Sequence, residues 1–64
     1  MILTEDQKSL LATSLRVAAE KYSENARAIR IEAPLMAKQF YLQAQQAREL
    51  ADTIDRCEQI YLTI

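Results

Sequence analysis

The sequence contains no glycine, no histidine and no tryptophan, and it has only one cysteine and one proline. Because phosphate and dinucleotide sites depend on glycine-rich turns, the lack of glycine argues against both. Without histidine, Cys57 has no imidazole base to activate it, and a zinc site has too few ligands. A lone cysteine also excludes a disulfide within the chain. We therefore expect a protein that is not an enzyme and that uses no metal or cofactor.

Targeting and membrane signals are also lacking. The longest apolar runs fall far short of the roughly 20 residues that cross a bilayer, and the pattern of a secretory signal peptide is not apparent. A single unpaired cysteine suits a reducing compartment. These features predict a cytoplasmic protein without a membrane partner. The net charge of −1 provides no general attraction to nucleic acid or anionic lipid.

Small size limits the core that this chain can build. The 64 residues make one domain, and a domain of this size buries only about 60% of the surface of its unfolded chain. Half of the residues are hydrophobic, but many of them are alanines, which favour helix more than they add buried area. Such domains usually need a disulfide, a metal or a partner. With the first two excluded, we expect a partner.

The only proline separates two predicted helices. The segment from Thr4 to Gln7 has the pattern of a capping box, and Pro34 suits the first position of a helix. We expect one helix over about 5–30, a turn over about 31–34, and a second helix over about 35–61. A turn this short makes the helices antiparallel neighbours. The predicted fold is therefore all-α, a two-helix antiparallel hairpin over residues 1–64, with neither strands nor an internal repeat apparent.

Each predicted helix has one principal apolar face. Phe40 and Tyr22 occupy the middle of these faces, and we expect them to fill the core between the helices. The face of the first helix contains Leu11, Leu15, Ala18, Tyr22, Ala26 and Ile29. The face of the second contains Met36, Phe40, Ala44, Ala47, Leu50, Ala51, Ile54, Cys57 and Tyr61.

Other apolar side chains lie away from these principal faces. Two helices that pack face to face leave such side chains uncovered, and uncovered apolar strips mark binding surfaces. Tyr41 projects onto an otherwise polar sector, and tyrosine is enriched at interfaces. The residues expected to bind a partner are Leu10, Val17, Leu35, Leu42 and Ile60, together with Tyr41.

Basic residues on the first helix suggest an alternative partner. Arg16, Arg27 and Arg30 share one sector, which is a weak signal for RNA. The same sector holds Glu20 and Glu24, and we expect Glu24 and Arg27 to form an i, i+3 ion pair. This self-neutralised surface makes nucleic acid a less favoured partner.

The second half of the chain resembles a known family. The segments Lys38-Gln39-Phe40 and Gln45-Gln46-Ala47-Arg48, followed by Leu50 and Ile54, are similar to the E-type co-chaperones of type III secretion needle subunits, the YscE-like family. The resemblance implies a non-catalytic helical hairpin. It also implies two partners: a tetratricopeptide-like chaperone and, with it, a needle subunit whose amphipathic helix is covered and kept from polymerising.

Two alternatives to a co-chaperone remain open. One is a homodimeric four-helix bundle with a regulatory role, which includes RNA binding. The other is a small helical oligomer that sequesters a ligand. Each would cover the surplus apolar side chains, so the sequence does not decide whether they face a different protein or a second copy.

Overall fold

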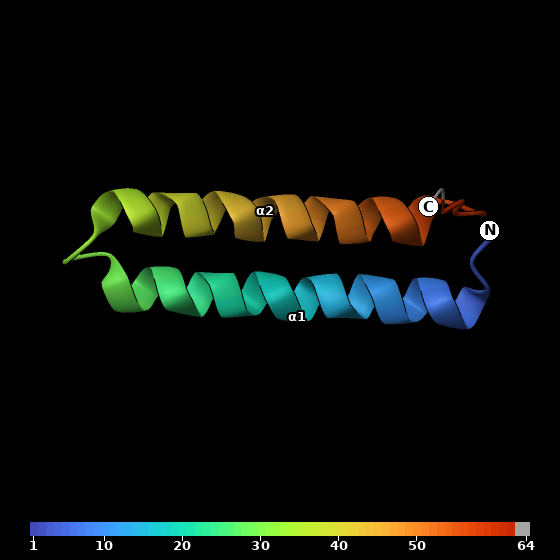
Figure 1. Cartoon of the computed structure of the whole chain (residues 1–64), viewed down its shortest axis with the longest axis horizontal. Coiled ribbons are helices and arrows are strands. Elements are labelled where there is room, and N and C mark those ends of the chain that lie inside the picture. The colour runs from blue at the N-terminus through green and yellow to red at the C-terminus, as the bar shows by residue number, and fades with distance from the viewer. Residues whose placement is uncertain (63–64) are drawn as a thin grey trace.

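Two long helices lie side by side in the computed structural model, which describes residues 1–62 (Figure 1). Helix α1 spans Glu5–Ile29 and helix α2 spans Pro34–Arg56. Residues 30–33 turn the chain back, so the helices run antiparallel. The hairpin measures 43 × 19 × 18 Å. The expected all-α hairpin is confirmed, and within residues 1–62 the only extended pairing is one isolated bridge.

The helix starts follow the sequence signals. The Thr4 hydroxyl accepts a hydrogen bond from the backbone N–H of Gln7, and the Gln7 side chain accepts one from the backbone N–H of Thr4, which completes the capping box. Pro34 occupies the start of α2. Ala33 before it has a non-helical backbone, with φ −138° and ψ 70°, because the proline ring disfavours the helical region for the residue that precedes it. The turn is therefore determined locally by Ala33 and Pro34.

The end of α2 differs from the prediction, because the helix stops at Arg56 rather than near Tyr61. Cys57 already has an extended backbone. Beyond Cys57 the backbone forms hydrogen bonds with the first residues of the protein and not with a preceding helical turn. The Leu3 N–H donates to the Ile60 carbonyl at 2.9 Å, and the Leu62 N–H donates to the Met1 carbonyl at 2.8 Å.

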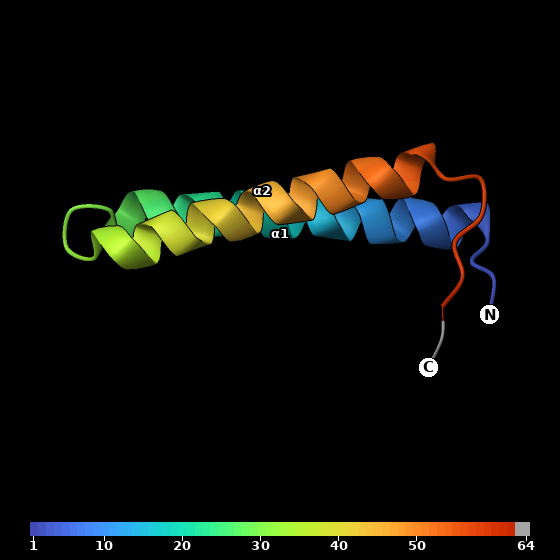
Figure 2. The ribbon, with the colours of Figure 1, turned by 90° about the horizontal axis from the view of Figure 1, so that it is seen from above.

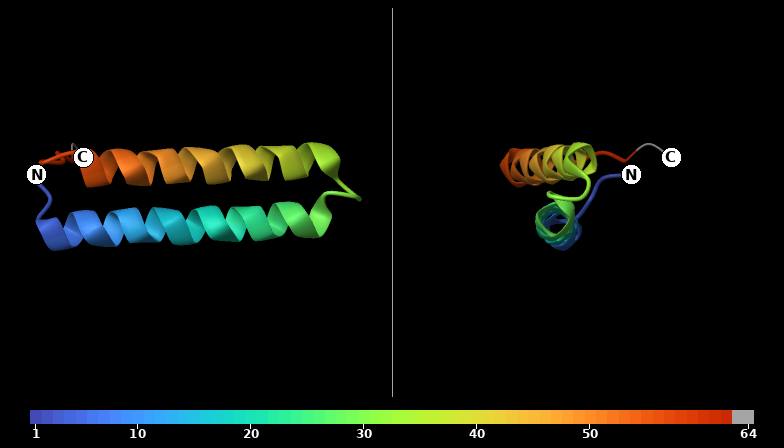
Figure 3. Two further views of the ribbon diagram at one scale, coloured as in Figure 1. Left: turned by 180° about the vertical axis from the view of Figure 1, so that it is seen from behind. Right: turned by 90° about the vertical axis from the view of Figure 1, so that its left-hand side faces the viewer.

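These bonds, with an antiparallel bridge between Ile2 and Tyr61, form what we call the terminal ribbon, residues 1–3 and 60–62. The two segments lie together at the open end of the hairpin, and both leave the helix pair on the same side (Figures 2 and 3). Long-range pairing thus overrides the helical periodicity that had placed Ile60 and Tyr61 on the second helix.

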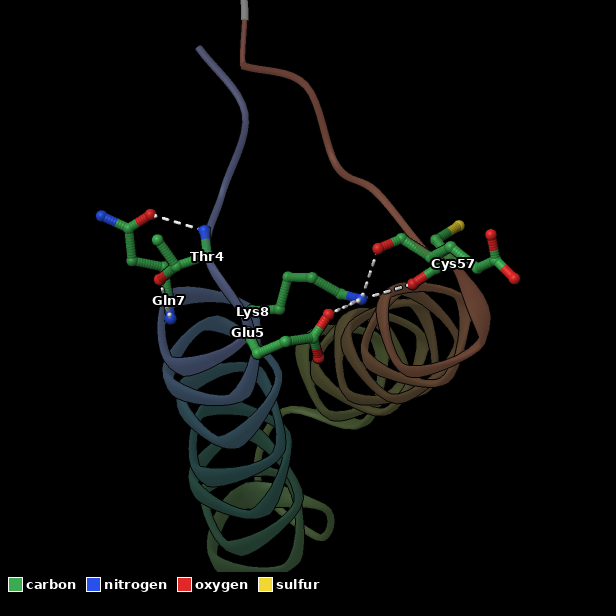
Figure 4. A network of polar contacts seen from close by, with 6 residues as sticks. Thr4, Glu5, Gln7, Lys8 and Cys57 are labelled. Carbon is green, nitrogen blue, oxygen red and sulfur yellow. Dashed lines mark hydrogen bonds and ion pairs between the residues drawn. The ribbon is translucent and has the colours of Figure 1, made fainter.

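Lys8 of α1 binds the backbone that follows α2, at the open end of the hairpin (Figure 4). Its ammonium group donates to the backbone carbonyls of Cys57 and Glu58 and to the carboxylate of Glu5, the last at 3.3 Å. The residue is only 7% exposed. A cation is favourable at the end of a helix, where carbonyl groups lack intrahelical partners. Lys8 therefore caps α2 from the neighbouring helix.

Alanine forms the closest contact between the helices. The fully buried side chains recur at every seventh position, as in a coiled coil: Ala12, Ala19 and Ala26 on α1, and Ala37, Ala44 and Ala51 on α2. Ala12 and Ala51 belong to one buried cluster. An antiparallel register with this pair opposed also sets Ala19 against Ala44 and Ala26 against Ala37. We call these six residues the alanine seam.

Large side chains flank the alanine seam instead of filling it. Phe40 and Tyr22 are half-buried and stack on each other, with ring centroids 6.2 Å apart. Met36 and Leu50, expected on the principal face, are 57% and 51% exposed. The predicted faces are partly right: they included Ala26, Ala44, Ala51 and Ile54, which are buried, but they left out the buried Ala12, Ala19 and Ala37. Ile54 is the exception among these large side chains, because it is only 4% exposed and shares one buried cluster with Ala12 and Ala51.

The seam reveals an internal repeat that hydrophobic pattern alone did not make apparent. Residues 10–29 align with residues 35–54 at an offset of 25 positions. Identical pairs at this offset are Leu10 and Leu35, Ala12 and Ala37, Ala19 and Ala44, Glu24 and Glu49, Ala26 and Ala51, and Ile29 and Ile54. Because the helices are antiparallel, a local twofold axis perpendicular to them relates the two halves.

Candidate protein-binding surface

The alanine seam divides the surface of the hairpin into two flanks. In a heptad pattern, the positions beside the seam on one side of each helix face their counterparts across the pair. One flank is identified by its contacts: the Arg16 guanidinium donates to Asp52 at 3.0 Å and also to Asp55, and Arg48 donates to the Ser23 hydroxyl at 3.2 Å. We call this side the charged flank.

The charged flank carries most of the ionic groups near the seam. Hydrogen bonds with Asp55 and Asp52 raise the pKa of Arg16 above its ordinary value, so this guanidinium stays charged and engaged. A depression of about 420 Å³ beside it is also lined by Arg27 and Arg48. The charged residues of this flank and its outer border are Arg16, Glu20, Arg27, Arg30, Lys38, Arg48, Asp52 and Asp55.

The expected ion pair between Glu24 and Arg27 is not the one that forms. Glu24 instead lies 3.9 Å from Lys21, also at i, i+3 spacing. Of the three arginines proposed for RNA, Arg16 and Arg27 line the same depression on the charged flank. Arg16 is held by two carboxylates, while Arg30 lines a separate depression near the turn.

The opposite side of the seam is almost free of charge. Helical geometry places Leu11, Ala18, Asn25, Met36, Gln43 and Leu50 there, and we call these six residues the charge-poor flank. Its outer border contains Ser14, Lys21, Ala28, Gln39, Gln46 and Thr53, of which only Lys21 is charged. Leu11 is half-buried, whereas Met36 and Leu50 are more than half exposed. An uncharged surface with exposed large apolar side chains is typical of an interface core.

Four of the residues predicted to bind a partner are exposed but not gathered together. Leu10 and Val17 point outward from α1, and Leu35 and Leu42 point outward from α2, each pair one heptad apart. The internal repeat relates one pair to the other. They therefore lie on opposite outer faces, and a single partner helix could not cover both. Their role in binding stays a prediction.

Tyr41 and Leu42 line one shallow depression of about 320 Å³ near the turn, together with Arg30, Lys38 and Gln45. Tyr41 lies on the charged flank and is partly exposed. The depression brings two of the predicted partner-binding residues together. Sequence reasoning placed them on separate sectors, because adjacent positions of a helix are about 100° apart.

Ile60 lies elsewhere than predicted. Because α2 ends at Arg56, Ile60 cannot continue the strip that contains Leu35 and Leu42. It is half-buried on the terminal ribbon and packs, with Leu11 and Leu15, against the buried cluster of Ala12, Ala51 and Ile54. The ribbon thus lies beside the charge-poor flank. Ile60 closes one end of the hairpin core.

The described residues include one free cysteine. Cys57 is half-buried, and residues 1–62 contain no group of three metal-ligating side chains. Neither described helix combines the length and the apolar character needed to span a membrane. The surface features described are the two flanks and the two shallow depressions. Comparisons with protein-family models, curated proteins and solved structures gave no match to this chain.

Proposed function

We propose that the protein is a non-catalytic binding hairpin whose charge-poor flank covers α-helices of a partner. The observation that carries this proposal is the composition of the buried surface. Alanines occupy the closest contact between the helices, while Met36 and Leu50 remain largely exposed. Burying a large aliphatic side chain contributes roughly 1.5–3 kcal/mol, so an isolated hairpin leaves much of its available stabilisation unused. A helix laid along the flank would recover it.

The specific form that we propose is the E-type co-chaperone of type III secretion. Its support is the resemblance around Phe40 and Arg48, together with a hairpin of suitable length. In this role the hairpin would bind a tetratricopeptide-like chaperone and help it to cover the needle subunit. The charge-poor flank would face the larger chaperone, because an apolar contact suits a permanent partner.

Co-expression with a tetratricopeptide-like chaperone and a needle subunit from the source organism tests this function. We expect the three chains to co-purify and the needle subunit to sediment as a monomer within the complex. A needle subunit that polymerises equally with and without the hairpin would exclude the co-chaperone role.

Two adjacent residues provide a matched pair of variants. Met36 lies on the charge-poor flank, and Leu35 points outward from the same turn of α2. We expect Met36→Asp to reduce co-purification of the chaperone at least tenfold and Leu35→Asp to leave it near the parent level. The reverse pattern would assign binding to the outer faces, as the sequence alone had suggested.

A further inference from the structure

The charge-poor flank also indicates what covers it when the chain is alone. We propose that a second copy of this chain packs on the flank, forming a four-helix bundle from two hairpins. This inference rests on the proposed function, because both require the same flank to bind helices. The inference adds that a second copy of the chain occupies the charge-poor flank.

The exposed area is larger than a monomer of this mass requires. A compact 7.3 kDa monomer exposes about 4,200 Å² by the usual scaling, whereas this hairpin exposes 5097 Å². The excess of about 900 Å² matches the roughly 800 Å² that each partner contributes to a standard interface. The radius of gyration, 14.1 Å, likewise exceeds the roughly 11 Å expected for a compact chain of this length. One hairpin therefore has the shape of half an assembly.

The distribution of charge favours a second copy as the occupant. In a twofold dimer the same patch is used by both copies, so a charge near the centre of the patch meets a like charge or must be paired. The charge-poor flank avoids this problem, because Lys21 on its border is the only ionic side chain. On the charged flank only Arg16, Asp52 and Asp55 form ion pairs within one hairpin, so a second copy would bring the other charges of this flank close to like charges. Of the two flanks, only the charge-poor flank is suited to pack against the same flank of a second copy.

The terminal ribbon fixes the orientation of the two copies. It leaves the helix pair on one side (Figure 3), and Ile60 places it beside Leu11 of the charge-poor flank. A twofold axis parallel to the helices would bring the two ribbons against each other. An axis perpendicular to the helices, within the interface, puts each ribbon beside the turn of the other copy. We infer this second, head-to-tail arrangement.

Two leucines on the same helix provide the test. Leu50 lies on the charge-poor flank and is 51% exposed, while Leu42 points outward from α2 and is 49% exposed. Sedimentation equilibrium of the parent chain should give a dimer at micromolar concentration. Leu50→Asp should raise the dimer Kd about a hundredfold or more, because each dimer buries this position twice. Leu42→Asp should change it less than about threefold.

Circular dichroism provides the folding control, since both variants should remain helical at the concentrations used. A monomeric parent chain would overturn the proposal, as would equal dissociation by both variants. The chaperone complex is measured separately. A dimer without chaperone binding would refute the proposed function alone, and chaperone binding by a chain that stays monomeric would refute this inference alone.

A label on Cys57 can be used to measure how the two copies are oriented, because Cys57 is the only cysteine and lies at the open end of the hairpin. Spin labels on Cys57 of the dimer should be separated by a distance on the order of the 43 Å hairpin length. A separation below about half of that length would overturn the head-to-tail arrangement. Labelled Leu50→Asp chains, as monomers, should show no defined distance.

Discussion

Replacing Ala19 with leucine inserts three carbon atoms where the two helices come closest. Ala19 is completely buried, and the register of the alanine seam sets it against Ala44 near the middle of the hairpin. Leucine has a helix propensity close to that of alanine, so the substitution tests packing between the helices and not the stability of α1 itself. To accept the added volume, the helices must separate or their side chains must leave preferred rotamers.

The expected cost follows from the size of the intrusion. Extra methylene groups in a closely packed contact cost about 1–3 kcal/mol, and a domain of this length has a total stability of roughly 3–10 kcal/mol. For so small a domain, each kcal/mol lowers the melting temperature by about 4–8 °C. We expect Ala19→Leu to melt about 4–24 °C below the parent protein when helicity is followed by circular dichroism.

Val17→Leu is the control, because Val17 points outward from the same helix, away from both flanks, and is 63% exposed. It should change the free energy of unfolding by less than about 0.5 kcal/mol. Both variants are compared at one protein concentration, since self-association makes the melting temperature depend on concentration. If Ala19→Leu melted with the parent protein, the alanine seam would not be the closest contact between the helices.

Three further predictions concern other parts of the hairpin. Phe40→Ala should cost about 1.5–3 kcal/mol in urea unfolding, below the roughly 3–5 kcal/mol of a core phenylalanine, because Phe40 is half-buried against Tyr22; a cost of 4 kcal/mol or more would show that it is core. Lys8→Ala should speed amide exchange at Leu3 and Leu62, which a mass-spectrometric exchange experiment detects, because it removes the cation that holds the end of α2; unchanged exchange would exclude this fastening role. The parent protein should show no salt-sensitive, submicromolar RNA binding in fluorescence anisotropy, because Arg16 is held by two carboxylates; such binding would favour the RNA alternative.

The hairpin could be predicted because its signals are local. The capping box at Thr4 and the proline at position 34 act on neighbouring backbone groups, and both helix starts are observed where they were expected. The end of α2 depends instead on residues at the other end of the chain. Nothing in the sequence around Arg56 encodes the bonds between residues 60–62 and residues 1–3. That boundary was therefore misplaced.

The candidate binding surface is harder to locate from the sequence than the fold, because an angular position on a helix identifies a buried or an exposed residue only once the contact line between the helices is known. Choosing Phe40 as the centre of the buried face assigned Leu50 to the core and Leu42 to the interface. The structure leaves both about half exposed, on different sides of α2. The seven-residue spacing of alanines from Ala12 to Ala26, repeated from Ala37 to Ala51, was the signal that could have located the contact line.

The terminal ribbon has a consequence for the order in which the chain folds. Contacts near the turn close loops of only a few residues, whereas the bridge between Ile2 and Tyr61 closes a loop of almost the whole chain. We expect a hairpin of this kind to form from its turn, so that the ribbon forms last and opens first. Opening it would uncover Leu3 and Ile60 beside Leu11 while both helices stay intact. The apolar surface available to a partner would thus grow by a small local motion, without unfolding of the hairpin.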